Sequence, residues 1–143
     1  MSRRRARQSE RGNSLVETAL MAPWIFFLMI GVFDFGFYAH AAICTQNAAR
    51  VAGLVVGSSG TAGVTEACNA AKLEMANLPN ASSFGDCSAD PLKIAVSNGN
   101  VAGQNTRIVT LNYQGIPIFP FPGVTSGTLR FSRTVEVPAD YGN

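Results

Sequence analysis

One long apolar stretch dominates the first third of the chain. The sixteen residues from Thr18 to Phe33 carry no charge, and extending the stretch back to Leu15 adds one carboxylate, Glu17. A membrane-spanning helix needs about 20 predominantly apolar residues. The sequence therefore predicts a transmembrane helix here, and Asp34, the next charge, is expected to mark its outer edge and reach water.

The residues that follow favour continuation of this helix. They are rich in alanine, which has the highest helix propensity, as far as Gly53. We expect one helix from about Ser14 to Val56, roughly 65 Å long and twice the thickness of a bilayer core. Its outer half is expected to pack on a globular part through an apolar stripe of Ile43, Val51, Leu54 and Val55.

A second, shorter helix is predicted after a Gly/Ser-rich connector at residues 57–63. It covers about residues 65–78, with Thr65 as its cap and Pro79 ending it. Its apolar positions fall on one helical face. These positions are Ala67, Cys68, Ala71, Met75 and Leu78.

The rest of the chain changes to strand periodicity. Three runs alternate apolar and polar residues, at 92–96, 109–113 and 129–137. Gly- and Asn-rich segments around 98–105 and 115–127 are expected to join them into an antiparallel meander with one face covered by helix. The fold class is therefore α+β, with a long N-terminal membrane-spanning helix that extends into a small head. That head holds a second helix and an antiparallel sheet of three or more strands.

An apolar, proline-rich loop interrupts this alternation at residues 116–123. Its proline density excludes a central strand. Two interpretations remain open at this point: exposed Phe119 and Phe121 dock on a partner, or the loop folds over the domain's own core.

Charge is distributed unevenly. Residues 1–12 contain five arginines and one acidic residue, a net charge of +4, against −2 for the remaining residues. The positive-inside rule places such a basic segment in the cytoplasm and the bulk of the chain across the membrane. We therefore predict a basic cytoplasmic leader at 1–12, a transmembrane helix at 13–56 and a periplasmic head at 64–143. A basic stripe on a folded face is missing, so no nucleic-acid partner is expected.

A cleaved secretory signal is an alternative for the apolar stretch. Its usual apolar region has about 7–15 residues, shorter than the stretch here, and Ala39 and Ala41 would form its cleavage site.

The three cysteines are an odd number for a chain in an oxidising compartment. Cys68 and Cys87 lie in the predicted head, and a bridge between them is expected to join the second helix to the segment before the first strand. Pairing of Cys44 with either of them remains an alternative. Neither a CxxC pair nor metal-ligand spacing of Cys and His is present, so no metal site is predicted.

No catalytic constellation is recognisable. The chain has one histidine, His40, and lacks clustered carboxylates, a phosphate-binding glycine loop and an acid–base pair outside the predicted helix. The sequence predicts a protein that is not an enzyme and needs no cofactor.

The head of the apolar helix carries a further pattern. Gly12 is followed by four residues and then by Glu17. This spacing resembles the processing site of type IV prepilins and pseudopilins, where a prepilin peptidase cuts after the glycine. The resemblance implies a cut between Gly12 and Asn13 and a pairing of Glu17 with the amino terminus of a neighbouring subunit.

Residues 11–53 resemble more particularly the opening of TadE-like proteins, the pseudopilins of tight-adherence (Flp) pilus systems. The segments that carry this resemblance are 15–20, Pro23, 32–36 and 45–50. It implies a minor pilin of the bacterial inner membrane that joins an adhesive, extracellular pilus. The implied partners are other pilin subunits, the Tad assembly machinery, the prepilin peptidase and membrane lipid. The alternative is an uncleaved signal-anchor protein whose periplasmic head is a scaffold or a ligand-binding module.

Overall fold

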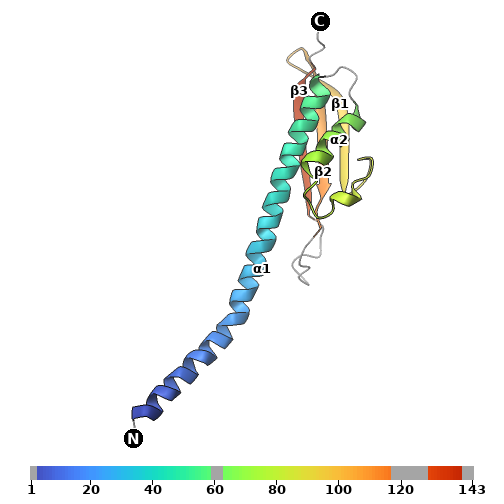
Figure 1. Cartoon of the computed structure of the whole chain (residues 1–143). Helices are drawn as coiled ribbons and strands as arrows, with labels where there is room; N and C mark the ends of the chain where they lie inside the picture. Colours follow the sequence, from blue (N-terminus) through green and yellow to red (C-terminus); the bar gives the residue numbers. More distant parts are fainter. Residues whose placement is uncertain (1–2, 59–62, 117–128, 140–143) are drawn as a thin grey trace. The chain divides into compact units, whose positions relative to one another are not determined.

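The computed structural model describes residues 3–58, 63–116 and 129–139, with side chains described from residue 14 onward. Figure 1 shows its α+β elements in chain order, which confirms the predicted fold class. The chain divides into two compact units, Met1–Gly36 and Phe37–Asn143. The elements are α1 (Arg3–Ser58), α2 (Val64–Glu74), the short 3-10 helix η1 (Ala81–Ser83), β1 (Leu92–Val101), β2 (Gln104–Gln114) and β3 (Arg130–Pro138).

Helix α1 extends beyond its predicted limits at both ends. It begins at Arg3 instead of Ser14 and continues to Ser58. Arginine, glutamine, alanine and glutamate, which fill most of residues 3–11, are all good helix formers, so the basic segment continues the helix. The prediction of a helix start at Ser14 was wrong because it followed hydrophobicity and ignored this propensity.

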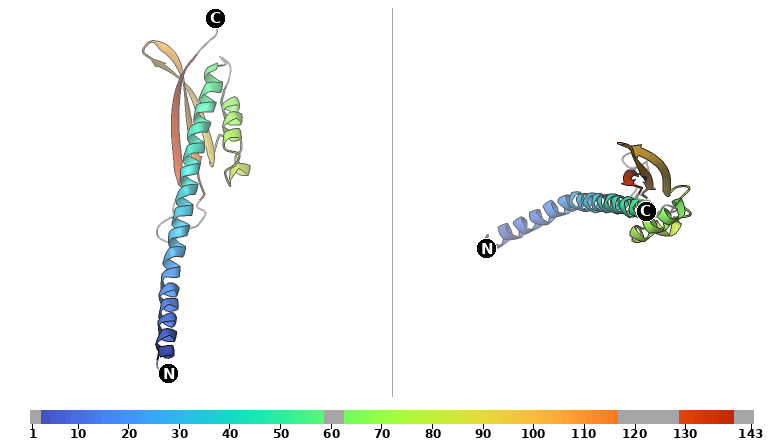
Figure 2. Two further views of the ribbon diagram at one scale, coloured as in Figure 1. Left: turned by 60° about the vertical axis from the view of Figure 1, so that its left-hand side comes forward. Right: turned by 90° about the horizontal axis from the view of Figure 1, so that it is seen from above.

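The sheet is an antiparallel meander in the order β1-β2-β3, as predicted (Figure 2). Its first connection is much tighter than expected. The pairing of β1 with β2 runs from Leu92↔Tyr113 to Val101↔Gln104, so most of the predicted loop at 98–105 is strand. Ala102 and Gly103 alone form the turn, with φ of 53° and 84°. Two positive φ values match the two-residue turn whose twist suits a hairpin.

Strand β3 pairs with β2 from Gln114↔Arg130 to Thr106↔Pro138. Its bounds agree with the predicted strand within one residue. The connection between the two strands includes Phe119 and Phe121, which lie outside the described residues, as do residues 59–62 of the predicted connector.

Helix α2 is capped differently from the prediction. Its N-cap is Gly63, and Thr65 lies inside the first turn. The carboxylate of Glu66 accepts a hydrogen bond from the Gly63 N–H at 2.8 Å. This N–H has no acceptor within the helix, as is usual for backbone donors at a helix N-terminus. This bond holds the pKa of the Glu66 carboxyl below its usual value. A glutamate at the third helical position therefore provides the cap that Thr65 was expected to provide.

The end of α2 was also predicted too late. The helix ends at Glu74, and the chain continues in turns to Asn80. The apolar face is nevertheless correct. All five predicted residues are buried: Ala67, Cys68, Ala71, Met75 and Leu78.

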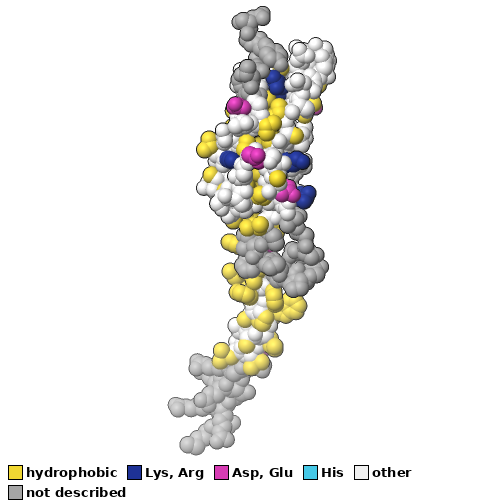
Figure 3. Space-filling view, turned by 90° about the vertical axis from the view of Figure 1, so that its right-hand side faces the viewer, with side chains coloured by type: hydrophobic (Ala, Val, Ile, Leu, Met, Phe, Trp, Pro, Cys, Tyr) yellow, Lys and Arg dark blue, Asp and Glu magenta, His cyan; other side chains and the backbone are white. Residues whose placement is uncertain are grey.

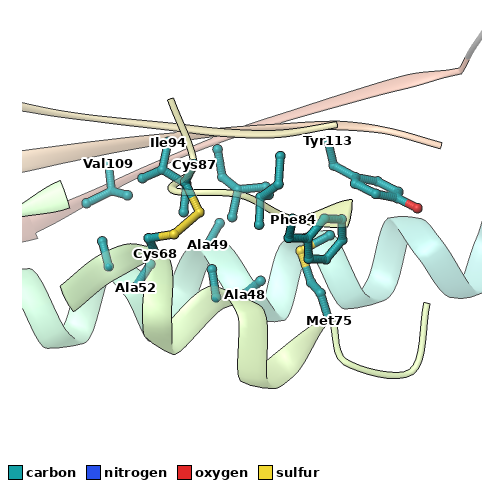
Figure 4. Packing of buried hydrophobic residues seen from close by; sticks show 14 of the residues in the cluster. Ala48, Ala49, Ala52, Cys68, Met75, Phe84, Cys87, Ile94, Val109 and Tyr113 are labelled. Atoms are coloured by element: carbon teal, nitrogen blue, oxygen red, sulfur yellow. A yellow bond between two sulfur atoms is a disulfide. The ribbon is translucent and has the colours of Figure 1, made fainter. Parts of the chain in front are cut away.

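The stripe by which α1 packs on the head differs from the prediction. Ile43 and Leu54 are 58% and 65% exposed, while Val51 and Val55 are half-buried. The buried residues of α1 are smaller: Ala41, Thr45, Ala48, Ala49, Ala52 and Val56. All of these except Thr45 belong to one hydrophobic core with α2 and the sheet (Figure 4). The prediction failed because it ranked positions by hydrophobicity, whereas the short side chains are the ones that allow close approach.

Two glycines of α1 show how close that approach is. A Cβ atom at Gly53 would lie 3.2 Å from Cγ1 of Val135, and one at Gly57 would lie 3.1 Å from Cγ2 of Val137. Protein interiors are close-packed, so the helix can lie here only where side chains are minimal.

Tyr113 ties the segment after α2 to the end of the sheet. Its buried hydroxyl donates to Oδ1 of Asn80 at 2.6 Å, and Nδ2 of Asn80 donates to the carbonyl of Gln114 at 3.1 Å. The ring meets Phe84 edge-on and stacks on Phe131, with centroids 6.0 and 6.2 Å away. Burial raises the pKa of Tyr113 in spite of the hydrogen bond, so the phenol stays protonated as the donor in this contact.

Candidate functional site in the apolar segment of α1

The apolar segment of α1, residues 15–35, exposes large side chains along its length. Thirteen large hydrophobic side chains between these limits are 55–74% exposed. In Figure 3 the coloured side chains of this segment that face the viewer are hydrophobic. By length and composition, residues Ser14–Ser58 contain a helix able to cross a membrane. A helix that is apolar all round and uncovered by protein requires lipid or other helices around it.

Thr18 is a polar residue of the segment whose side chain is satisfied within the helix itself. The hydroxyl of Thr18 donates to the carbonyl of Ser14 at 2.9 Å, the usual bond of a threonine one turn further on. Pro23 lies inside the helix and supplies no N–H to the preceding turn. Spanning helices tolerate such a residue because neighbouring helices can satisfy the freed carbonyl.

Glu17 is the charged residue at the start of the segment. It is exposed, and it forms no ion pair with any other side chain that the structure describes. Gly12 and Asn13 lie in the same helix, and the structure describes only the backbone of these two residues. Residues 13 and 17 are four positions apart, so helix geometry places them on one face. The carboxylate is thus one helical turn from the peptide bond at which processing is predicted.

Asp34 is a residue whose environment the sequence did not predict. Its side chain is only 6% exposed, although it was expected to reach water, and Phe33 and Phe35 beside it are 63% and 74% exposed. Its Oδ1 atom has no hydrogen-bond partner among the described residues. The available signal was its isolation as the only charge between Glu17 and Arg50. The prediction failed because the pattern of charged and apolar residues along the chain does not determine how far a given side chain is exposed.

The cysteines pair as the sequence favoured. Cys68 and Cys87 form a disulfide with Cα atoms 5.8 Å apart, which joins α2 to the segment before β1. Cys44 is free, and its Sγ lies 3.6 Å from Nε2 of His40 one turn earlier in α1. The alternative pairings of Cys44 are therefore not formed. Within the described ranges, no three His, Cys, Asp or Glu side chains are grouped as a metal site.

Comparison with known proteins concerns this same helix. A family model described as TadE-like protein matches residues 12–53, less than a third of the chain. Neither a curated protein nor a solved structure matches. The matched segment begins at Gly12 and includes Glu17 and Asp34, whereas α2 and the sheet lie outside it. Residues 12–53 are thus similar to TadE-like proteins, and the matched segment is contained within α1.

Proposed function

We propose that this protein is a minor pilin, or pseudopilin, that takes part in assembly of a Tad (Flp) type IV pilus. One observation carries the proposal. The large side chains of residues 15–35 are exposed, and this apolar segment begins within the Gly12-x4-Glu17 spacing of the matched family segment. Such a helix is suited to lie first in lipid and then among the helices of neighbouring subunits.

The proposed orientation of the chain in the membrane follows from the positive charge of residues 1–12. The five arginines before the apolar segment keep the N-terminus in the cytoplasm, and the head then lies in the periplasm. A disulfide between Cys68 and Cys87 suits that oxidising compartment. The protein thus resides in the bacterial inner membrane with a single pass before it enters an extracellular pilus.

Processing changes the electrostatics at the start of the segment. Cleavage after Gly12 removes the arginines and creates an α-amino group at Asn13, with an ordinary pKa of about 8. In the filament interior, the Glu17 carboxylate needs a cationic partner because an unpaired buried charge is costly. The amino terminus of a neighbouring subunit supplies it and fixes the axial position of one subunit against the next.

This function needs no reaction at the protein itself. The free energy of assembly comes from helix packing and from neutralisation of Glu17, and the covalent step belongs to the prepilin peptidase. We therefore propose a structural component without enzymatic activity or cofactor.

Intact-mass analysis of the protein from its native membrane tests the proposal. We expect a chain that begins at Asn13, and we expect Gly12→Val to remain full-length. Gly31→Val is the matched control, because a Cβ atom at Gly31 meets no atom within 4 Å. This variant should be cut like the parent. Full-length parent protein in cells with an active prepilin peptidase would instead support an uncleaved signal anchor.

A further inference from the structure

The face of α1 that points away from the head core is only partly polar. Within the unit Phe37–Asn143, we define the outer stripe as Ile43, Asn47, Arg50 and Leu54, which follow one another by four, three and four residues. All four are exposed, and the two apolar ones are exposed by more than half. This spacing is that of a helix face that packs against another helix. In a periplasmic head it would be left in water.

A groove runs along this stripe toward α2. Its volume is about 210 Å³, and it is lined by Asn47, Arg50, Val51 and Leu54 of α1 and by Glu74, the last residue of α2. Arg50 and Val51 point about 100° apart around the helix, and Asn47 and Leu54 lie between them. Glu74 belongs to the Val51 side, because Gly53, on the opposite side of α1 from Val51, lies against Val135 of β3. The groove thus has a positive rim and a negative rim.

Neither rim charge has an ion-pair partner among the residues that the structure describes. Arg50 and Glu74 are both exposed. Opposite charges that face each other across an apolar strip, without meeting, are arranged for pairing with a separate surface.

We propose that the outer stripe binds a second copy of this chain, related by a two-fold axis parallel to α1. Arg50 of each copy then meets the partner's Glu74, and the two Leu54 side chains pack beside the axis. The parallel arrangement rests on the proposed function, since both copies cross the membrane in the same direction. Their periplasmic α1 segments therefore run the same way.

Symmetry makes a second copy the fitting occupant. A two-fold axis along the groove places the positive rim of one copy opposite the negative rim of the other, and it does so twice. Rims of equal sign would repel in the same arrangement. The surface is thus self-complementary in charge as well as apolar at its centre.

Cysteine cross-linking in native membranes tests the pairing. In a Cys44→Ser background, which retains the Cys68–Cys87 disulfide, Leu54→Cys should give a covalent dimer with a short bis-maleimide. Ser97→Cys, an exposed residue of β1 outside the outer stripe, is the matched control and should stay monomeric. Equal yields at the two positions, or an adduct of Leu54→Cys with a different protein, would overturn the proposal.

Charge reversal tests whether Arg50 of one copy pairs with Glu74 of the other. Added to the Leu54→Cys protein, Arg50→Glu alone and Glu74→Arg alone should each lower the dimer yield roughly fivefold, because two contacts per dimer turn from attraction to repulsion. The double reversal should restore most of the yield. A double variant no better than either single one would contradict the pairing.

The same samples separate this inference from the proposed function. Intact mass reports whether each chain is cut after Gly12. Chains that are cut but not cross-linked at Leu54→Cys would refute the pairing alone. Chains that are cross-linked but never cut would refute the pilin function alone.

Discussion

Helix α1 has two apolar regions that differ in side-chain size and in exposure. Between residues 15 and 35 the apolar side chains are large and more than half exposed, whereas between residues 41 and 57 the side chains that face the core are small and buried. Hydrophobicity alone therefore does not indicate which part of a helix packs on its own protein. Side-chain size does: alanine and glycine allow α1 to approach the sheet and α2, while bulky residues remain for another environment.

The largest effect that can test this contrast is a charge in the exposed segment. Leu28 is 69% exposed, and Leu28→Arg should lower the inserted-to-uninserted ratio roughly hundredfold, because a centrally placed arginine costs about 3 kcal/mol on insertion scales. Extraction of membranes at alkaline pH measures this ratio. Leu73 on α2 is even more exposed, at 79%, and Leu73→Arg should insert like the parent. An equal loss of membrane insertion in both variants would mean that insertion does not depend on residues 15–35 in particular.

Next in size is the disulfide that supports the buried surface. Replacing Cys68 and Cys87 by serine should lower the free energy of unfolding of the head by about 2–3 kcal/mol, since the bridge closes a loop of 19 residues. Denaturant unfolding of the full chain in detergent measures the change. Cys44→Ser removes the free thiol and should change stability much less. A loss at Cys44 as large as that at the disulfide would contradict the structure.

A smaller effect is expected from enlarging the small surface. Ala49 is fully buried, so Ala49→Leu should cost about 1–3 kcal/mol through overpacking. Ala39→Leu adds the same atoms at an exposed position of the same helix and should be nearly neutral. Thermal unfolding compares the two variants. If they behave alike, small size at position 49 is not what allows α1 to pack.

The smallest effect concerns pH and the cap of α2. The pKa of Glu66 is lower in the folded head than in the unfolded chain, so its contribution is present above the unfolded value of about 4.3. It is lost as pH falls through the folded value. The stability difference between the parent and Glu66→Gln should therefore shrink on acidification below about pH 4. A constant difference would show that the Gly63–Glu66 hydrogen bond does not depend on the charge.

Several elements could be predicted because local chemistry decides them. The apolar run predicted the exposed segment, strict alternation predicted β3 and the second half of β2, and cysteine position favoured the Cys68–Cys87 bridge. The helical spacing of Ala67, Cys68 and Ala71 gave the buried face of α2 correctly. In each case the residues that carry the pattern also make the contacts.

The failures arose where contacts between distant segments decide. Which face of α1 is buried depends on Val135 and Val137, far along the chain, and on how closely they approach Gly53 and Gly57. The environment of Asp34 likewise has no local signature. The tight turn at Ala102 and Gly103 was missed because glycine- and asparagine-rich sequence is typical of loops as well as of hairpins.

The proposed role of Glu17 in assembly is tested by comparing membrane insertion with pilus incorporation of Glu17→Gln. Both are quantified in one strain, from the membrane fraction and from sheared pili. We expect insertion equal to that of the parent and incorporation lower by more than about tenfold, because the partner amino group loses its buried counter-charge. Incorporation at the parental level would contradict the proposed pairing of Glu17 and leave the apolar segment of α1 as a membrane anchor alone.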